Sequence, residues 1–281
     1  MARACLLAVL GLFVLPARTA AAAPTEEVKS VNLIDWYYGA VYGTGVYRVN
    51  DKTVVQFRIP FAYAPKKFQV RGVEGKLLLP VSIGFYDFDL STIFDEKIAE
   101  RVGTFSFLPG VEFLVPVGNN WLLRPFGNLG GGAEYSSGGR ALIYAVGLKS
   151  RRSWSRGGTE FLLGGELQYA GYRTNEARTS TLSRIGIGGN ALFPLGANVR
   201  GRDLNWGVHL IYRYYFNDLE SLIPALTRVE TVEIDDEVEV ALTLGVDRPV
   251  KLFGFGLDRL GVGFVYGGDI LGIRLVTGFP F

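Results

Sequence analysis

The sequence is poor in the residues that most often carry redox, metal or acid–base chemistry. Its 281 residues include one cysteine, one histidine and one methionine, and the formal net charge is +2. The cysteine, Cys5, lies near the start of the chain, so the residues that follow it can form no disulfide with one another. Nucleic-acid binding usually shows as a clustered basic face, and the near-neutral charge gives no reason to expect one. We therefore expect no nucleic-acid partner and no cofactor.

Long apolar runs are almost absent. After residue 22, no segment reaches the roughly eighteen consecutive apolar residues of a membrane-spanning helix. The one apolar run, LLAVLGLFVL from Leu6 to Leu15, follows the basic Arg3 and precedes the small residues Ala20 to Ala22. The run is too short to cross about 30 Å of hydrocarbon as a helix. This order of segments instead predicts a cleavable secretory signal peptide over residues 1–22.

Glycine and aromatic residues are abundant, with 37 Gly, 19 Phe and 14 Tyr. Many segments alternate between two kinds of residue, as in the final stretch ILGIRLVTGFPF, where Ile273 and Leu275 flank Arg274. Alternation with a period of two predicts a strand with a different environment on each face. About twelve such segments follow Trp36, and ten or fourteen are also compatible with the sequence because strand boundaries shift by a few residues.

The two faces of these segments indicate where the strands lie. One face is apolar and carries Tyr, Trp or Phe near the strand ends, as in the aromatic girdles of membrane barrels. The other face is rich in glycine and charge, which suits a crowded lumen. A closed barrel also pairs every backbone group, as lipid requires. We predict an all-β fold: a closed antiparallel transmembrane β-barrel over residues 36–281, preceded by a short periplasmic lead-in over residues 23–35.

Two connections between the predicted strands are longer than the others, at residues 89–101 and 217–231. With twelve strands both fall on the same side of the membrane, which we expect to be the cell exterior, as long loops of such barrels do.

Charged and polar residues on the glycine-rich faces are predicted to point into the lumen. Their basic and acidic members nearly balance, which leaves two interpretations open. The side chains pair across a largely filled lumen, since unpaired they would be costly to desolvate, or they line a small conducting pore. The residues predicted to face the lumen are Arg58, Lys76, Glu112, Glu134, Lys149, Glu160, Glu166, Arg184, His209, Arg213, Glu237, Glu239, Arg259 and Arg274.

The alternating strands and the aromatic end of the chain resemble bacterial outer-membrane β-barrel proteins as a broad class. In that class the last strand is a recognition signal for the barrel-assembly machinery, with a polar residue, a glycine and two aromatic residues. Arg274, Phe279 and Phe281 fit this signal, whereas the glycine is displaced to Gly278 and Pro280 is an unusual insertion. We expect Phe279 and Phe281 to lie on the lipid side of the last strand.

The resemblance implies a place in the outer membrane of a Gram-negative bacterium. The implied partners are outer-membrane lipids and lipopolysaccharide, together with the barrel-assembly machinery and periplasmic chaperones during biogenesis. It picks out no family with a known activity.

We expect a structural barrel or a narrow porin-like channel rather than an enzyme. One alternative is an enzyme acting on lipid or peptide, because some outer-membrane barrels are lipid hydrolases or acyltransferases that use a histidine with a serine. Their sites face lipid, whereas His209 is predicted to face the lumen and has no serine beside it. A protein that binds ligands through its surface loops is a further alternative.

Overall fold

A computed structural model of the chain describes residues 38–49, 52–65, 68–70, 72–86, 102–135, 138–175, 179–216, 223–225, 228–230, 235–252, 255–268 and 270–281. All of them belong to one compact unit, Asn32–Phe281. The predicted signal peptide and lead-in lie outside the described residues. Across the described ranges, no helix is long and apolar enough to cross a membrane.

Strands make up most of the described chain, as the alternating sequence predicts. One short helix, α2, covers Tyr38–Val41. The strands are β1 Gly45–Val49, β2 Lys52–Tyr63, β3 Gln69–Val70, β4 Val73–Tyr86, β5 Val102–Phe107, β6 Gly110–Pro116, β7 Trp121–Glu134, β8 Arg140–Arg156, β9 Thr159–Thr174, β10 Thr179–Val199, β11 Arg202–Tyr215, β12 Ile223–Ala225, β13 Arg228–Glu230, β14 Asp236–Leu252, β15 Phe255–Gly267 and β16 Ile270–Val276.

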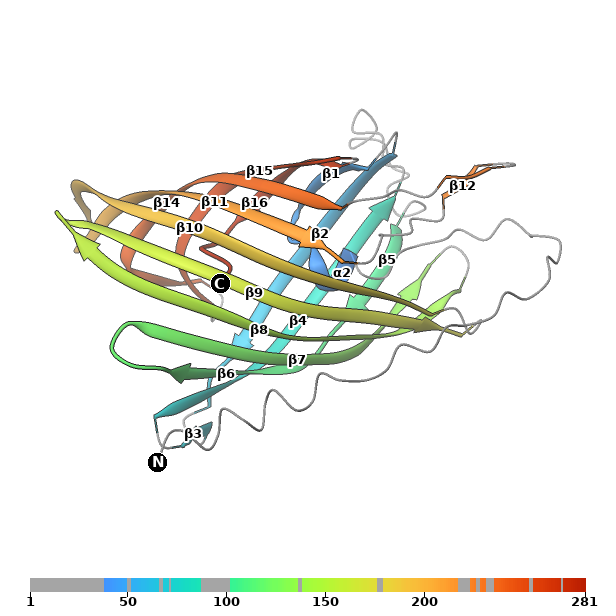
Figure 1. The fold of residues 1–281 in the computed structure, drawn as a ribbon, viewed down its shortest axis with the longest axis horizontal. Coiled ribbons are helices and arrows are strands. Elements are labelled where there is room, and N and C mark those ends of the chain that lie inside the picture. The colour runs from blue at the N-terminus through green and yellow to red at the C-terminus, as the bar shows by residue number, and fades with distance from the viewer. Residues whose placement is uncertain are drawn as a thin grey trace. The chain divides into compact units, whose positions relative to one another are not determined.

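Antiparallel ladders join these strands into a closed ring (Figure 1). The ring runs from β2 through β1, β16, β15, β14, β11, β10, β9, β8 and β7 to β5 and β4, and β4 pairs with β2 again. β5 and β6 lie one after the other along β4 and form one strand of the wall. The barrel therefore has twelve strands. The predicted fold class and the predicted number of strands are confirmed.

The outer face of the ring is apolar and the inner face is polar or small. Along β14, Val240, Leu242 and Leu244 are exposed on the outside, whereas Glu239, Ala241 and Thr243, which alternate with them, are buried. The same alternation continues through the long strands β9, β10 and β11. A water-soluble barrel would have the opposite distribution, so the wall has the architecture of an outer-membrane β-barrel.

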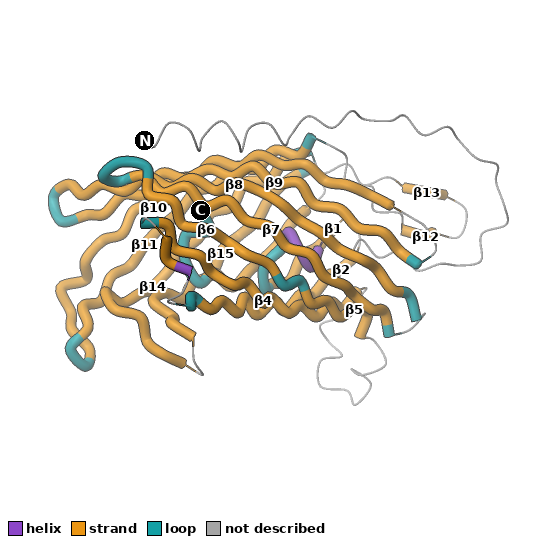
Figure 2. The backbone as a smooth tube through the Cα atoms, turned by 90° about the horizontal axis from the view of Figure 1, so that it is seen from below, coloured by secondary structure: helices purple, strands orange, loops and turns teal. Residues whose placement is uncertain are grey.

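The chain enters the barrel differently from the sequence-based expectation. The alternation from Trp36 to Val49 predicts a single strand with one apolar face, but only Gly45–Val49 joins the wall as β1. Before it, α2 contacts the neighbouring strands β2 and β4 and also β8, which lies further round the ring, so the helix lies inside the lumen (Figure 2). Ala40 and Tyr42, predicted to face outward, are buried there. Their apolar side chains satisfy the alternation equally well inside and outside the barrel.

The connections at the two ends of the barrel differ in length. One end has tight turns with positive φ angles, such as Gly157 and Gly158 between β8 and β9, and Arg200 and Gly201 between β10 and β11. β4 and β11, the strands that precede the two long connections, both end at the opposite end of the barrel, and the connections themselves lie mostly outside the described residues. We name these ends the turn end and the loop end.

Candidate functional site in the barrel lumen

A cluster of buried charges lies on the inner face of neighbouring strands. Its centre is Arg213 on β11, which is buried and approaches three carboxylates. Its guanidinium nitrogens lie 2.7 Å from Glu237, 2.9 Å from Glu239 and 3.5 Å from Glu166. Glu237 and Glu239 come from β14 and Glu166 from β9, so one arginine joins three strands. Charge-assisted hydrogen bonds of this kind are stronger than neutral ones.

Glu239 is the most shared acidic group of this cluster, and its side chain is 0% exposed. It accepts from Arg213 and lies 3.2 Å from Arg274 Nη1 on β16. Its other oxygen lies 3.1 Å from Nε2 of His209 on β11. Arg184 on β10 completes the set through Glu166, at 2.9 Å. We name these residues the ionic belt: Glu166, Arg184, His209, Arg213, Glu237, Glu239 and Arg274.

A second ion pair lies on the other side of the lumen. Arg124 on β7 donates to both oxygens of Glu112 on β6, at 3.1 and 3.0 Å. The sequence-based prediction included Glu112 but missed Arg124. The signal was present, because Arg124 alternates in step with Glu134 on the same strand, and Glu134 is predicted to face the lumen.

The fourteen predicted lumen residues fall into three groups by exposure. Glu112, Glu134, Glu166, Arg184, His209, Arg213, Glu237, Glu239 and Arg259 are buried, Arg58, Lys76, Lys149 and Arg274 are partly exposed, and Glu160 is exposed. Glu160 keeps the inward phase of β9 but lies next to the turn end, where water reaches it. Arg259 bonds to Thr243 and Asn205 rather than to a carboxylate.

The segment Thr277–Phe281, which we name the strap, leaves the wall after β16 and enters the lumen. Gly278 adopts a φ of 144°, a region that favours glycine, and redirects the chain. Phe281 is completely buried, and its ring meets that of Phe279 edge to face at a centroid distance of 5.1 Å. The prediction that Phe279 and Phe281 face lipid is therefore wrong. A role in assembly recognition for Arg274, Phe279 and Phe281 stays a prediction.

The strap crosses the lumen to the opposite wall. Lys149 Nζ on β8 donates to the Pro280 carbonyl at 2.9 Å, and Arg124 Nη1 donates to the main-chain oxygen of Phe281 at 3.0 Å. β8 lies half-way round the ring from β16, where the strap begins. Gly164 and Gly188 lie under Phe281: a Cβ at Gly164 would overlap the Phe281 side chain, and a Cβ at Gly188 would come within 3.1 Å of its ring.

Toward the loop end, the lumen is filled by apolar side chains instead of charges. Tyr42 and Tyr47 meet with ring centroids 5.1 Å apart, and they join one buried cluster with residues from the opposite wall, such as Ile143 and Leu182. Helix α2 contributes Ala40 and Val41 to the same cluster. The loop half is thus packed like a protein core, and the charges lie in the middle of the barrel.

A cavity of about 680 Å³ remains between α2, the ionic belt and the strap. Its lining is unbalanced in charge, with six basic residues and two acidic ones. The charged residues are Arg58, Arg124, Lys149, Arg184, Arg213, Arg274, Glu112 and Glu166. Phe57, Ile59 and Leu275 also line it, although they belong to the exposed outer face.

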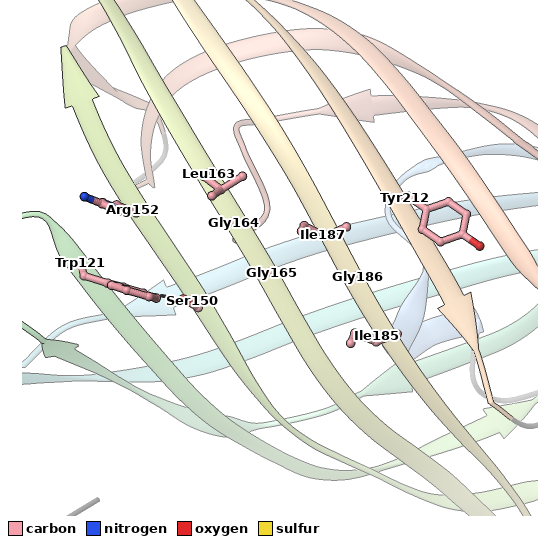
Figure 3. A pocket seen from close by; sticks show the side chains of 10 residues that line it. All are labelled: Trp121, Ser150, Arg152, Leu163, Gly164, Gly165, Ile185, Gly186, Ile187 and Tyr212. Atoms are coloured by element: carbon pink, nitrogen blue, oxygen red, sulfur yellow. Dashed lines mark hydrogen bonds between the residues drawn. The ribbon is translucent and has the colours of Figure 1, made fainter.

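A separate groove of about 470 Å³ lies on the outer face of β7 to β11 (Figure 3). It passes over Gly165 between the larger side chains of Leu163, Ile187 and Tyr212. At one end Trp121 Nε1 donates to Ser150 Oγ at 2.6 Å. The lining is almost entirely apolar apart from this end, where Arg152 also lies, so the shape of the groove suits an acyl chain.

Comparison with known proteins identifies no family. No protein-family model matches the sequence, and no curated protein matches it. Among solved structures, the beta domain of the Bordetella autotransporter Brka matches at 12% identity and a TM-score of 0.48, covering 82% of this chain and 91% of that one. The siderophore receptor PirA from Pseudomonas aeruginosa matches at 12% identity and a TM-score of 0.34, covering 82% of this chain and 37% of that one. The chain thus spans little more than a third of that receptor.

Proposed function

We propose that the protein is an integral barrel of the bacterial outer membrane with a structural role, and that it does not conduct ions. Its apolar exterior suits a lipid environment, and its lumen is crossed by the strap rather than open along its axis. The observation that supports this most directly is the pair of bonds from Lys149 and Arg124 to the strap, because they hold it against the wall opposite its origin.

The ionic belt supports the same proposal. In a conducting pore, charged side chains contact water and passing ions and so tune selectivity. Here Arg213, Glu237 and Glu239 face one another and are buried, so their charges are largely neutralised within the wall. The apolar cluster around α2 also fills the loop half of the lumen, so the charges are not the only groups that obstruct it among the described residues.

The position of His209 supports a role other than lipid catalysis. A histidine acting on lipid needs access to the outer face, where acyl chains lie. The His209 side chain is 1% exposed and its Nε2 is engaged by Glu239. The tilted contact of its ring with Phe279, at 6.0 Å, adds a further lumen neighbour. We propose that it is a member of the ionic belt and not a general base.

Conductance in planar lipid bilayers tests the proposal. We expect no steady current from the wild-type protein at any applied voltage. A variant that lacks residues 278–281 should show intermittent current, because the middle of its lumen loses the strap. The double variant Arg124→Ala, Lys149→Ala, which keeps these residues but removes both anchors, is the second measurement in case the shortened chain does not fold.

Steady single-channel currents from the folded wild-type protein would overturn the proposal in favour of a narrow porin-like channel. Folding of each variant is checked by far-UV circular dichroism and by the slower migration on heating that folded barrels show in gels.

A further inference from the structure

The cavity beside the strap holds positive charge that the lumen does not neutralise. Six basic side chains line it, and the acidic groups that pair with them are Glu112, Glu166, Glu237 and Glu239. Among the described residues, Arg58 has no carboxylate within ion-pairing distance, and Lys149 lies opposite Glu166 in the β8–β9 register without bonding to it directly, since Glu166 pairs with Arg184. Arg58 donates to the Ala40 carbonyl at 2.9 Å, and Lys149 donates to the Pro280 carbonyl.

Charge without a carboxylate partner is costly in a lumen packed this closely. Neutral carbonyls satisfy some of the donors of Arg58 and Lys149, but they do not cancel the charge. An anion in the cavity would do so, because guanidinium and ammonium groups both bind carboxylate or phosphate oxygens. The lining thus favours a ligand that brings negative charge.

The wall beside this cavity is incomplete. β1 pairs with β2 only over Gly45–Val49 against Lys52–Gln56, and with β16 only as far as Arg274. Beyond that point Thr44 makes the last links, since its hydroxyl bonds to both the N–H and the carbonyl of Arg58 and its carbonyl accepts from Leu275 N–H. The chain then turns inward toward α2, so the rest of β2 has no β1 partner on this side.

An interrupted ladder is unusual in a membrane barrel, where unpaired backbone is tolerated only against protein or a hydrated cavity. The missing part of the ladder coincides with the cavity. Phe57 and Ile59, which are 52% and 50% exposed on the outer face, line the same cavity as the buried arginines. Leu275 on β16 faces them from the other side of the interruption. The cavity therefore opens sideways through an apolar rim.

We propose that this cavity binds an anionic amphiphile that enters through the wall from the membrane. The anionic head group lies between Arg58 and Lys149, and the acyl chain extends past Phe57, Ile59 and Leu275 toward the lipid. A volume of about 680 Å³ accommodates a head group and the first part of a chain. The proposal goes beyond a structural role, and binding and conductance are measured independently.

Binding of cis-parinaric acid, a fluorescent fatty acid, to the purified protein in a non-ionic detergent tests the proposal. We expect saturable binding, with displacement by dodecanoate and by dodecyl phosphate at lower concentrations than by dodecanol. The stronger of the two anions identifies the natural source as a free fatty acid or a lipid phosphate. Equal displacement by dodecanol would overturn the role of the charges.

Matched variants locate the site. Arg58→Gln and Lys149→Gln should each weaken binding by about tenfold or more, since each removes a charge-assisted contact. Arg156→Gln, an exposed arginine at the end of β8, should leave it unchanged. At the rim, Phe57→Ala should weaken binding several-fold, whereas Phe264→Ala, equally exposed on the outer face of β15, should not.

Circular dichroism confirms that each variant is folded before binding is measured. Absence of saturable binding to the folded wild-type protein would overturn the proposal, as would equal binding by the Arg58→Gln and Arg156→Gln variants. Neither result would bear on conductance, so the proposed structural role would stand.

Discussion

The two sides of the barrel differ in how the wall is built. On one side β8, β9 and β10 contain 17, 16 and 21 residues and pair along nearly all of their length. On the other, β1 contains 5 residues and β16 contains 7, and the ladder between β1 and β2 stops at Gly45. We name the second region, formed by β1, β2 and β16 with Thr44, the seam.

The two regions of the wall are therefore held together in different ways. On the side of the long strands, ion pairs join neighbouring strands on the inner face, such as Arg184 on β10 with Glu166 on β9. At the seam, the backbone ladders are short, and Thr44 adds the last hydrogen bonds to β2 and β16. The strap links the two sides, because it begins at the seam and is held by Lys149 and Arg124 on the far wall.

The largest effect is expected from Glu239→Gln, at the centre of the ionic belt, where β14 is tied to β11 and to β16 of the seam. The fully buried Glu239 carboxylate contacts Arg213, Arg274 and His209. A neutral glutamine in its place would leave the two guanidinium groups without a full counter-charge. Breaking a buried ion pair in this way costs about 3–5 kcal/mol of unfolding free energy. Urea unfolding of the protein refolded into lipid vesicles measures the loss.

Glu160→Gln is the matched control, because Glu160 follows the same inward phase but is exposed near the turn end. Its unfolding free energy should change by less than about 0.5 kcal/mol. Similar losses in both variants would mean that the ionic belt contributes no more than a surface charge does.

A smaller effect is expected where the strap rests on the wall. In Gly164→Ala the new Cβ would overlap the Phe281 ring, so the strap or β9 must shift. Overpacking of this kind costs about 1–3 kcal/mol. The same unfolding measurement applies, and conductance of this variant would report any loosening of the strap.

Gly189→Ala provides the comparison for the strap, since its Cβ would meet no atom closer than 3.9 Å. Alanine there should be neutral or slightly stabilising, because glycine weakens strand interiors. If Gly189→Ala were as harmful as Gly164→Ala, contact with Phe281 would not be the cause.

The smallest effect is expected at the seam, from Thr44→Val. The variant keeps the shape of the side chain but removes the hydroxyl that bonds to both backbone groups of Arg58. A loss of about 1–2 kcal/mol is expected. It should appear locally, as faster hydrogen exchange of the Arg58 amide, with the amides of β9 unchanged. Uniform acceleration across both strands would contradict a separate, weaker seam.

Alternation was enough to predict the wall. Residues such as Phe57, Leu210 and Leu242 face outward where the period of two places them, and twelve such segments close the ring. The charges of the ionic belt follow from the same rule, because they occupy the opposite phase. The same rule also places Arg124 on the inner face of β7, so it could have been predicted.

Alternation could not predict which segments leave the wall. Ala40 and Tyr42 before β1, and Phe279 and Phe281 after β16, continue an apolar pattern that fits lipid and a packed lumen equally. The deciding features are local, such as the positive φ of Gly278 and the break in pairing at Thr44. The pairing partners inside the lumen come from strands far away in the sequence, so no short window contains them.

The strap also bears on how the ring closes during folding. Its bonds join residues 131 and 157 positions apart, and these partners lie on strands from the middle of the chain. Once β7 to β10 are in place, docking the strap on them brings β16 close to its final position before β1 pairs with it. β1 and β16 are then already close to one another, so the entropic cost of forming the last ladder between them falls. We therefore expect the strap to act as a guide for closure, visible as slower refolding when Lys149 and Arg124 are both replaced by alanine.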